Sequence, residues 1–198
     1  MTNKVIDLFS GLGGFSEAFV MSGKYEVERY DNNTWLAEVP HTHMCDLEKY
    51  AIGTAEKPFL LLGSPPCLEF SNAYDAPKIR AKRLGLDYEP SVKLVEIFKE
   101  HVDRLQPKYW MMENVIGSIE WITPILGEPV QIIGPFVFWG NVPLLDLTME
   151  DRKQIRGAKK KQDKRHSPIR SNHRAKIPLE ISTAILRAIE SPTLENWL

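Results

Sequence analysis

The sequence predicts an α/β protein in which helices cover a mostly parallel sheet. Short apolar runs rich in β-branched and aromatic residues alternate with longer stretches of helical periodicity, which is typical of this fold class. With 198 residues, of which 43% are hydrophobic, the chain is long enough to bury a substantial core and short enough to form one domain. We therefore expect a single domain over residues 1–198.

Seven segments are predicted to be strands. Five have ranges 4–9, 26–30, 59–63 and 108–112, with a weaker candidate at 43–45. The last two, residues 130–133 and 136–139, are separated only by Gly134 and Pro135. Because that link is too short for a parallel crossover, these two strands should form an antiparallel hairpin at the end of the sheet.

Two helices are the clearest in the sequence. After Pro90, apolar residues recur at spacings of three and four from Val92 to Leu105, with Ser91 as a possible cap and Pro107 as a stop. The final helix is predicted to start at Ile177-Pro178, with the proline in a first-turn position. Its stripe of isoleucines should pack back onto the sheet.

Composition excludes several classes of protein. Cys45 and Cys67 are too few for a disulfide scaffold and are not spaced as a zinc site, so no metal is expected. No apolar run approaches 18 residues, and the first residues lack the pattern of a secretory signal. We expect a cytoplasmic protein.

The first predicted strand runs directly into the string DLFSGLGG at residues 7–14. Three glycines allow a tight turn and a close approach of the backbone to a ligand before a helix begins. A nucleotide-like cofactor fits such a loop, although the spacing differs from the usual dinucleotide fingerprint and a purely structural turn is the alternative. The candidate cofactor-binding residues are Asp7, Phe9, Ser10, Gly11, Gly13 and Gly14.

Two further aspartates follow predicted strands. Asp31 is placed to accept hydrogen bonds from ribose hydroxyls, and Asp46 could bind an adenine amino group. Taken singly, each is better explained as an ordinary loop acid.

The most informative stretch, residues 59–71, is a buried strand that ends in Pro65, Pro66 and Cys67. Two consecutive prolines stiffen the backbone, so the thiol is held at the end of a strand, where parallel-sheet proteins place active sites. The alternative is a small buried hydrophobe in a turn, as free cysteines commonly are. We interpret Cys67 as a nucleophile.

These strings resemble the DNA cytosine carbon-5 methyltransferases, whose hallmarks are an opening DLFSGxGG and a PPC loop followed by FS. The stretch Met111 to Val115 is similar to the family's ENV, and Lys176-Ile177-Pro178 to a degenerate form of its last motif. The resemblance covers residues 4–139 and 174–190. It implies a Rossmann-like class I methyltransferase fold, S-adenosylmethionine as the cofactor, DNA as the partner and a monomer.

The resemblance also implies roles for individual residues. Cys67 would add to carbon-6 of a cytosine flipped out of the DNA, so that carbon-5 can take the methyl group. Glu113 would stabilise the charge that builds up on the ring, and Asn114 would hold the loop in shape. The other positions carried over are Pro66 in the catalytic site, Pro65 in the cofactor site and Ser71 in the nucleic-acid site.

Two basic regions are candidates for binding nucleic acid. The loop at residues 75–86 could close over a flipped base and contact phosphates, or be only a mobile surface loop. Residues 152–176 hold eleven Lys or Arg against one acid, which favours a polyanionic partner, with a solvated linker as the alternative. The candidates are Lys78, Arg80, Lys82 and Arg83 in the loop, and Lys159, Lys160, Lys161, Arg170 and Arg174 in the basic segment.

The chain departs from the family pattern in places. Leu68 and Glu69 stand where a glutamine usually follows the nucleophile, and residues 131–139 lack the family's QxRxR string. Arg170 and Arg174 are the candidates to replace its arginines, and simple contact with phosphates is an equal alternative for either. The basic segment at 150–176 stands in place of a full target-recognition domain, as in small phage-type members, so we expect a short target sequence.

Three other functions remain open from the sequence. The protein could methylate RNA, act on free cytidine nucleotides, or bind DNA without catalysis. Retention of Cys67 and Glu113 argues against the silent binder, and the basic segment argues against mononucleotides.

Overall fold

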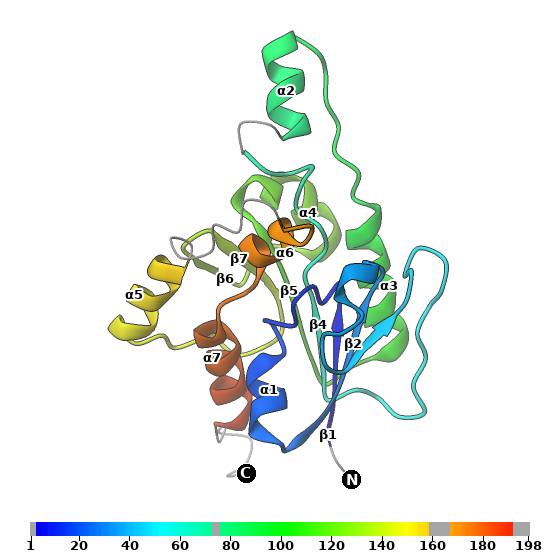
Figure 1. Cartoon of the computed structure of the whole chain (residues 1–198), viewed down its shortest axis with the longest axis vertical. Helices are drawn as coiled ribbons and strands as arrows, with labels where there is room; N and C mark the ends of the chain where they lie inside the picture. The colour runs from blue at the N-terminus through cyan, green and yellow to red at the C-terminus, as the bar shows by residue number, and fades with distance from the viewer. Residues whose placement is uncertain (1–2, 73–75, 159–166, 192–198) are drawn as a thin grey trace.

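The computed structural model describes residues 3–72, 76–158 and 167–191 (Figure 1). A seven-stranded sheet runs through them in the order β3-β2-β1-β4-β5-β7-β6. The strands are β1 (Asn3–Leu8), β2 (Tyr25–Asp31), β3 (Thr42–Met44), β4 (Leu60–Gly63), β5 (Tyr109–Val115), β6 (Gln131–Ile133) and β7 (Phe136–Gly140). The first five are mutually parallel, and β7 is antiparallel to both of its neighbours. The predicted α/β fold and its terminal hairpin are confirmed.

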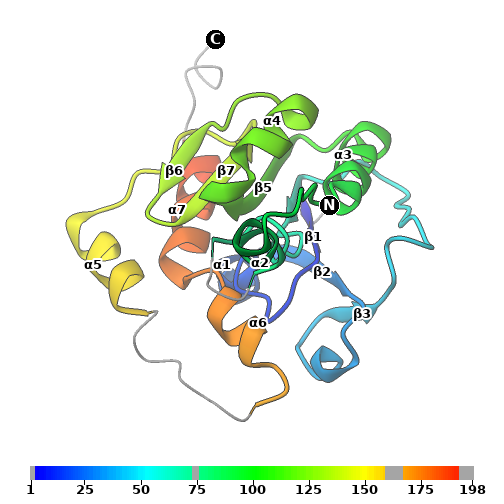
Figure 2. The same cartoon turned by 90° about the horizontal axis from the view of Figure 1, so that it is seen from above.

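Helices cover both faces of the sheet (Figure 2). On one face lie α1 (Glu17–Ser22), α5 (Met149–Ala158) and α7 (Leu179–Glu190), and on the other α3 (Lys93–Leu105) and α4 (Ile119–Leu126). Successive strand residues divide between the two cores: Val5 packs toward α1 and α7, whereas Ile6 packs toward α3. This period-two division is the reason the strands read as continuous apolar runs.

The strand order reverses at β1, which lies between β2 and β4. Open parallel sheets bind ligands outside the carboxyl ends of the strands at such a switch point. The glycine-rich loop leaves β1 there, and the loop with Cys67 leaves the neighbouring β4. The backbone N–H of Ser64 donates to the carbonyl oxygen of Leu8 at 3.2 Å, which joins the beginnings of the two loops.

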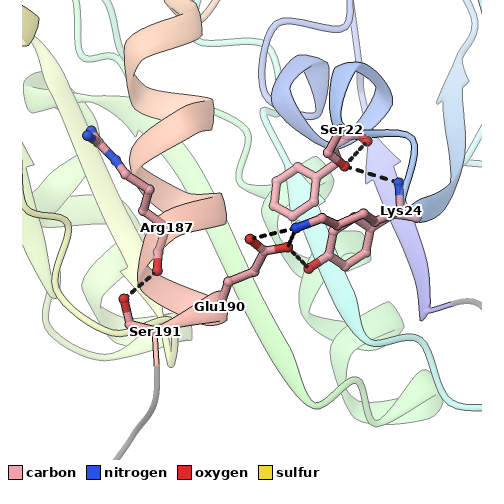
Figure 3. Close-up of polar contacts among 7 residues, drawn as sticks. Ser22, Lys24, Arg187, Glu190 and Ser191 are labelled. Atoms are coloured by element: carbon pink, nitrogen blue, oxygen red, sulfur yellow. Dashed lines mark hydrogen bonds and ion pairs between the residues drawn. The ribbon is translucent and has the colours of Figure 1, made fainter.

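The isoleucine stripe of the final helix packs onto the sheet, as predicted, and the helix also docks against α1. Ser182 is fully buried, and its hydroxyl donates to the carbonyl of Phe15 while accepting from the N–H of Ala18. At the far end of the sheet, Glu190 forms an ion pair of 3.1 Å with Lys24 and accepts a hydrogen bond from Tyr25 (Figure 3). Burial, followed by the nearby Glu190 carboxylate, raises the pKa of Tyr25 to about 12.

Several boundaries differ from the sequence expectations. Helix α3 begins at Lys93 with Val92 at its N-cap, so Ser91 lies one residue outside, where its hydroxyl accepts a 3.4 Å bond from the N–H of Lys93. In α7, Pro178 occupies the N-cap position rather than the first turn. Both shifts are within the usual fraying of helix ends.

Short helices form in the basic loop after Cys67, where a loop is expected, and in the basic segment, where a loop or a short helix is expected. Helix α2 (Pro77–Leu84) lies in the basic loop after Cys67, and α5 and α6 (Arg170–Ala175) flank residues 159–166 of the basic segment, which lie outside the described ranges. Two single turns of 3₁₀ helix, η1 (Thr34–Leu36) and η2 (Ile116–Ser118), follow β2 and β5. No helix within the described residues is long and apolar enough to cross a membrane.

Candidate active site

Cys67 lies in a tight turn just beyond the end of β4. The carbonyl oxygen of Cys67 accepts a 3.1 Å bond from the N–H of Phe70, whose ring is only 2% exposed and anchors the turn in the core. Pro65 is buried and Pro66 is exposed. Cys67 itself is half-buried and not part of a disulfide, so the residue is partly accessible in this turn.

The end of β5 supplies the next two predicted residues. Glu113 and Asn114 are both buried, at 9% and 1% exposure, and β5 runs parallel to β4 beside it. The side-chain amide of Asn114 donates a 3.1 Å hydrogen bond to the carbonyl of Pro65, while its oxygen accepts from the N–H of Val115. The fold thus brings the PPC and ENV strings together, and the hydrogen bond from Asn114 to Pro65 connects them.

The glycine-rich loop after β1 is tightly packed against the protein. Gly13 has a φ of +71°, and a Cβ there would lie 2.3 Å from the guanidinium carbon of Arg29. A Cβ on Gly14 would lie 2.4 Å from the carbonyl oxygen of Ile177. These two glycines are therefore required by close approach of the protein to itself, whatever ligand the loop binds.

Asp7 lies beneath this loop and is fully buried. Its carboxylate accepts a 2.6 Å bond from the Ser16 hydroxyl, which in turn accepts from Nε of Arg29. Arg29, only 4% exposed, also donates to the carbonyls of Gly13 and Pro40. Burial outweighs these partners and raises the pKa of Asp7 to about 6. Asp7 supports the loop from inside; direct contact with a cofactor remains a prediction.

The edge of the glycine loop has polar groups that fit a nucleoside. One Asp31 oxygen accepts from the N–H of Gly11 at 2.8 Å, and the other from the N–H of Asn33 at 2.9 Å. A carboxylate held in this way keeps lone pairs for ribose hydroxyls. The Ser10 hydroxyl is buried without a hydrogen-bond partner among the described residues, as expected of a group whose partner is a ligand.

A segment distant in sequence completes this edge. Asn172 of α6 accepts a 3.4 Å contact from the side chain of Asn33, and its amide nitrogen lies 3.8 Å from the Cβ position on Gly11. Helix α6 therefore lies against both loops of the candidate cofactor site. Phe9, directly after β1, has a left-handed φ of +55°.

Asp46 follows β3 on the same edge, because the N–H of Cys45 donates to the carbonyl of Asp31. The Asp46 carboxylate accepts a 2.9 Å bond from Lys49 and another bond from the N–H of Glu48. The bond from Lys49 is the main reason that the pKa of Asp46 is lowered. These contacts are local to the turn, so the adenine contact remains a prediction.

The basic loop after Cys67 rises above the carboxyl ends of the strands as helix α2 (Figure 1). Arg80, Lys82 and Arg83 are exposed on it. Lys78 instead forms a 2.8 Å ion pair with Glu120 of α4. Ser71 lies half-buried at the start of the loop.

In the basic segment, Arg170 and Arg174 are exposed on α6, at the end of the sheet that also carries α2 (Figure 1). Lys159, Lys160 and Lys161 lie outside the described residues. Within those residues, no group of three or more His, Cys, Asp or Glu side chains could hold a metal ion.

Three contributors were missed by sequence reasoning. Arg29 had a detectable signal, because it follows Tyr25 and Val27 at two-residue spacing and is therefore a charged residue on the inward face of β2. Ser16 and Asn172 had none, because their roles depend on segments that meet only in the fold.

Comparison with known proteins places these features in a family. Residues 3–120 match the family model described as C-5 cytosine-specific DNA methylase. The type II methyltransferase M.AquIA of Picosynechococcus sp. is 34% identical over 137 residues, covering 61% of this chain and 52% of the relative. M.HgiDI of Herpetosiphon aurantiacus is 34% identical over 122 residues, covering 57% of this chain and 37% of the relative.

Among solved structures, an Escherichia coli prophage protein named as a DNA modification methyltransferase is similar to this chain. It is 19% identical with a TM-score of 0.47, over 75% of this chain and 49% of that one. The chain spans about half of M.AquIA and a smaller part of M.HgiDI.

Proposed function

Because this chain belongs to the family of C-5 cytosine-specific DNA methylases, we propose that it transfers a methyl group from S-adenosylmethionine to carbon-5 of cytosine in DNA. The observation that carries the proposal is the bond from Asn114 to the carbonyl of Pro65. This hydrogen bond joins the turn that carries Cys67 to the end of β5 that carries Glu113. The reaction needs the Cys67 thiol and the Glu113 carboxyl beside the same base.

Carbon-5 of cytosine is too poor a nucleophile to accept a methyl group directly, so the ring must first be activated. The Cys67 thiolate would form a bond to carbon-6. The electron pair of the double bond between carbons 5 and 6 would move into the ring toward nitrogen-3, where the Glu113 carboxyl supplies a proton. The resulting enamine makes carbon-5 nucleophilic.

The second half of the reaction restores the ring. Once carbon-5 carries the methyl group, it loses its proton to a base in solvent. The electron pair returns to the ring, the bond to the Cys67 sulfur breaks, and nitrogen-3 gives its proton back to Glu113. The stiff turn keeps the sulfur in place throughout, since Pro65 and Phe70 are buried on either side of it.

The cofactor would be held by the loops after β1 and β2. S-adenosylmethionine supplies, when bound, an electrophilic methyl group on a sulfonium, whose sulfur would keep the electron pair of the broken bond as a thioether. Asp31 would accept from its ribose hydroxyls, and the Ser10 hydroxyl and Gly11 backbone would line the same edge. Arg29 and Asp7 would keep the loop in shape from below.

DNA would lie across the end of the sheet that carries α2 and α6. Exposed basic side chains on the two helices would contact phosphates on either side of a flipped cytosine. They are Arg80 and Lys82 on α2, and Arg170 and Arg174 on α6. Binding of this kind depends strongly on salt.

A duplex containing 5-fluorocytosine tests the proposed chemistry. Fluorine at carbon-5 cannot leave as a cation, so the protein should remain bonded to the base after methyl transfer. We expect a complex of protein and DNA that survives denaturant, requires S-adenosylmethionine and maps to Cys67 by peptide mass spectrometry. Absence of this complex, or its persistence in Cys67→Ser, would contradict the mechanism. Transfer to an RNA substrate instead would retain the chemistry and change the polymer.

A further inference from the structure

Glu69 lies two residues beyond the nucleophile, in the turn that the Cys67 carbonyl closes with the N–H of Phe70. Its carboxylate accepts a 2.5 Å hydrogen bond from the backbone N–H of Ser91. Ser91 lies 22 residues further along, just before α3. This hydrogen bond therefore connects the chain segment that precedes α2 to the segment that follows it.

Tyr88 is a second neighbour of the same carboxylate. Its pKa is raised by burial first, and then by the negative charge of Glu69 and a hydrogen bond to it. We define residues 76–90 as the α2 arm. Tyr88 and the buried Pro90 belong to the part of the arm that returns to the body, so Glu69 contacts the arm where it rejoins the fold.

The chain is also fixed at Phe70, where it leaves the Cys67 turn toward α2. Phe70 is buried, and its carbonyl oxygen lies 2.3 Å from where a Cβ on Gly117 would stand, so the chain is pressed against η2. The tip differs, since Leu84 and Leu86 are 71% and 61% exposed. The α2 arm is thus a projection whose returning end is held at the turn of Cys67 by Glu69.

We infer that Glu69 is a positioning residue that couples the α2 arm to the nucleophile turn. When basic residues of the arm contact DNA phosphates, the bond from Glu69 to Ser91 holds the turn in the position from which Cys67 attacks. The inference rests on the proposed function.

The test is the single-turnover rate of adduct formation on 5-fluorocytosine DNA, measured together with the affinity for S-adenosylhomocysteine and the thermal midpoint. Glu69→Ala should slow adduct formation about tenfold, the effect of losing one charge-assisted hydrogen bond from the reactive geometry. Glu69→Gln keeps an oxygen that can accept from Ser91 and should restore most of the rate. Cofactor affinity should be unchanged in both variants.

Two further variants sharpen the result. Glu89→Ala removes the same charge from an exposed position on the same arm and should react at the rate of the unaltered protein. Ser91→Pro removes the N–H donor while leaving Glu69 in place, and should reproduce the slow reaction of Glu69→Ala.

The outcomes are distinguishable. A Glu69→Ala rate within twofold of the unaltered protein, or a loss that Glu69→Gln does not restore, would overturn the inference. A loss accompanied by weaker cofactor binding and a lower melting temperature would also overturn it, because the role would then be structural. If the unaltered protein forms no adduct, the proposed function itself fails, and the inference fails with it.

Discussion

The side-chain amide of Asn114 lies 3.1 Å from the carbonyl oxygen of Pro65, two residues before Cys67, the proposed nucleophile. Both groups are buried, and the other end of the Asn114 side chain accepts from the N–H of Val115. The position of Cys67 therefore depends on β5 as well as on its own strand.

Asn114→Ala should reduce both stability and activity. Removing the amide leaves a buried carbonyl without its donor, which costs about 1–3 kcal/mol of unfolding free energy. The rate of methyl transfer should fall by a further factor of about 10 to 100, since small displacements of a reacting group are this costly. Urea unfolding and single-turnover kinetics measure the two effects separately.

Asn141 provides the matched control. Its side chain also bridges backbone groups near β5, donating to the carbonyl of Lys108 and accepting from the N–H of Trp110, but at the amino end of the strand. Asn141→Ala should lower stability without changing the rate constant. Equal loss of rate in the two variants would contradict the role assigned to Asn114.

Gly13→Ala should impair binding of the cofactor. The substitution combines a positive φ with a Cβ only 2.3 Å from the Arg29 guanidinium, so the loop must shift. Gly23 has a similar φ of +65° but open space around its Cβ position, and Gly23→Ala should cost only about 1 kcal/mol of stability. Calorimetric titration with S-adenosylhomocysteine should show weaker binding for Gly13→Ala alone.

Asp7 makes stability depend on pH in a defined window. Its pKa in the folded protein, about 6, is above the ordinary value of 3.8, so the folded state binds this proton more tightly than the unfolded state. The stabilising contribution is complete below pH 3.8 and is lost as the pH rises through about 6. The shift in pKa from 3.8 to about 6 corresponds to about 3 kcal/mol of unfolding free energy.

Asp7→Asn should remove this contribution to the pH dependence. The measurement is the free energy of unfolding in urea at intervals from pH 4 to pH 7, for both proteins. The difference between them should change with pH across this range and level off above it. A constant difference would show that Asp7 titrates normally.

Salt dependence should identify the DNA-binding surface. Arg174→Ala and Lys82→Ala should each reduce the slope of log K against log salt by about 0.9, the effect of one phosphate contact. Lys24 lies at the opposite end of the sheet, paired with Glu190 (Figure 3), so Lys24→Ala should leave the slope unchanged. Equal slopes in all four proteins would place the DNA elsewhere.

Much of the architecture was accessible from the sequence because its signals are local. The seven strands follow from apolar runs, and the antiparallel hairpin from the two-residue link at Gly134-Pro135. Helix α2 was missed because none of its residues is buried, so no apolar stripe marks it. The links from Arg29 to Gly13 and from Glu69 to Ser91 depend on long-range contacts, which no local pattern encodes.

The most direct test of the account is to incubate the protein with unmodified duplex DNA and S-adenosylmethionine, digest the DNA to nucleosides and identify the methylated base by mass spectrometry. The account predicts 5-methyldeoxycytidine with the unaltered protein and none with Cys67→Ser. Methylation of another atom or base, or undiminished 5-methyldeoxycytidine with Cys67→Ser, would contradict it.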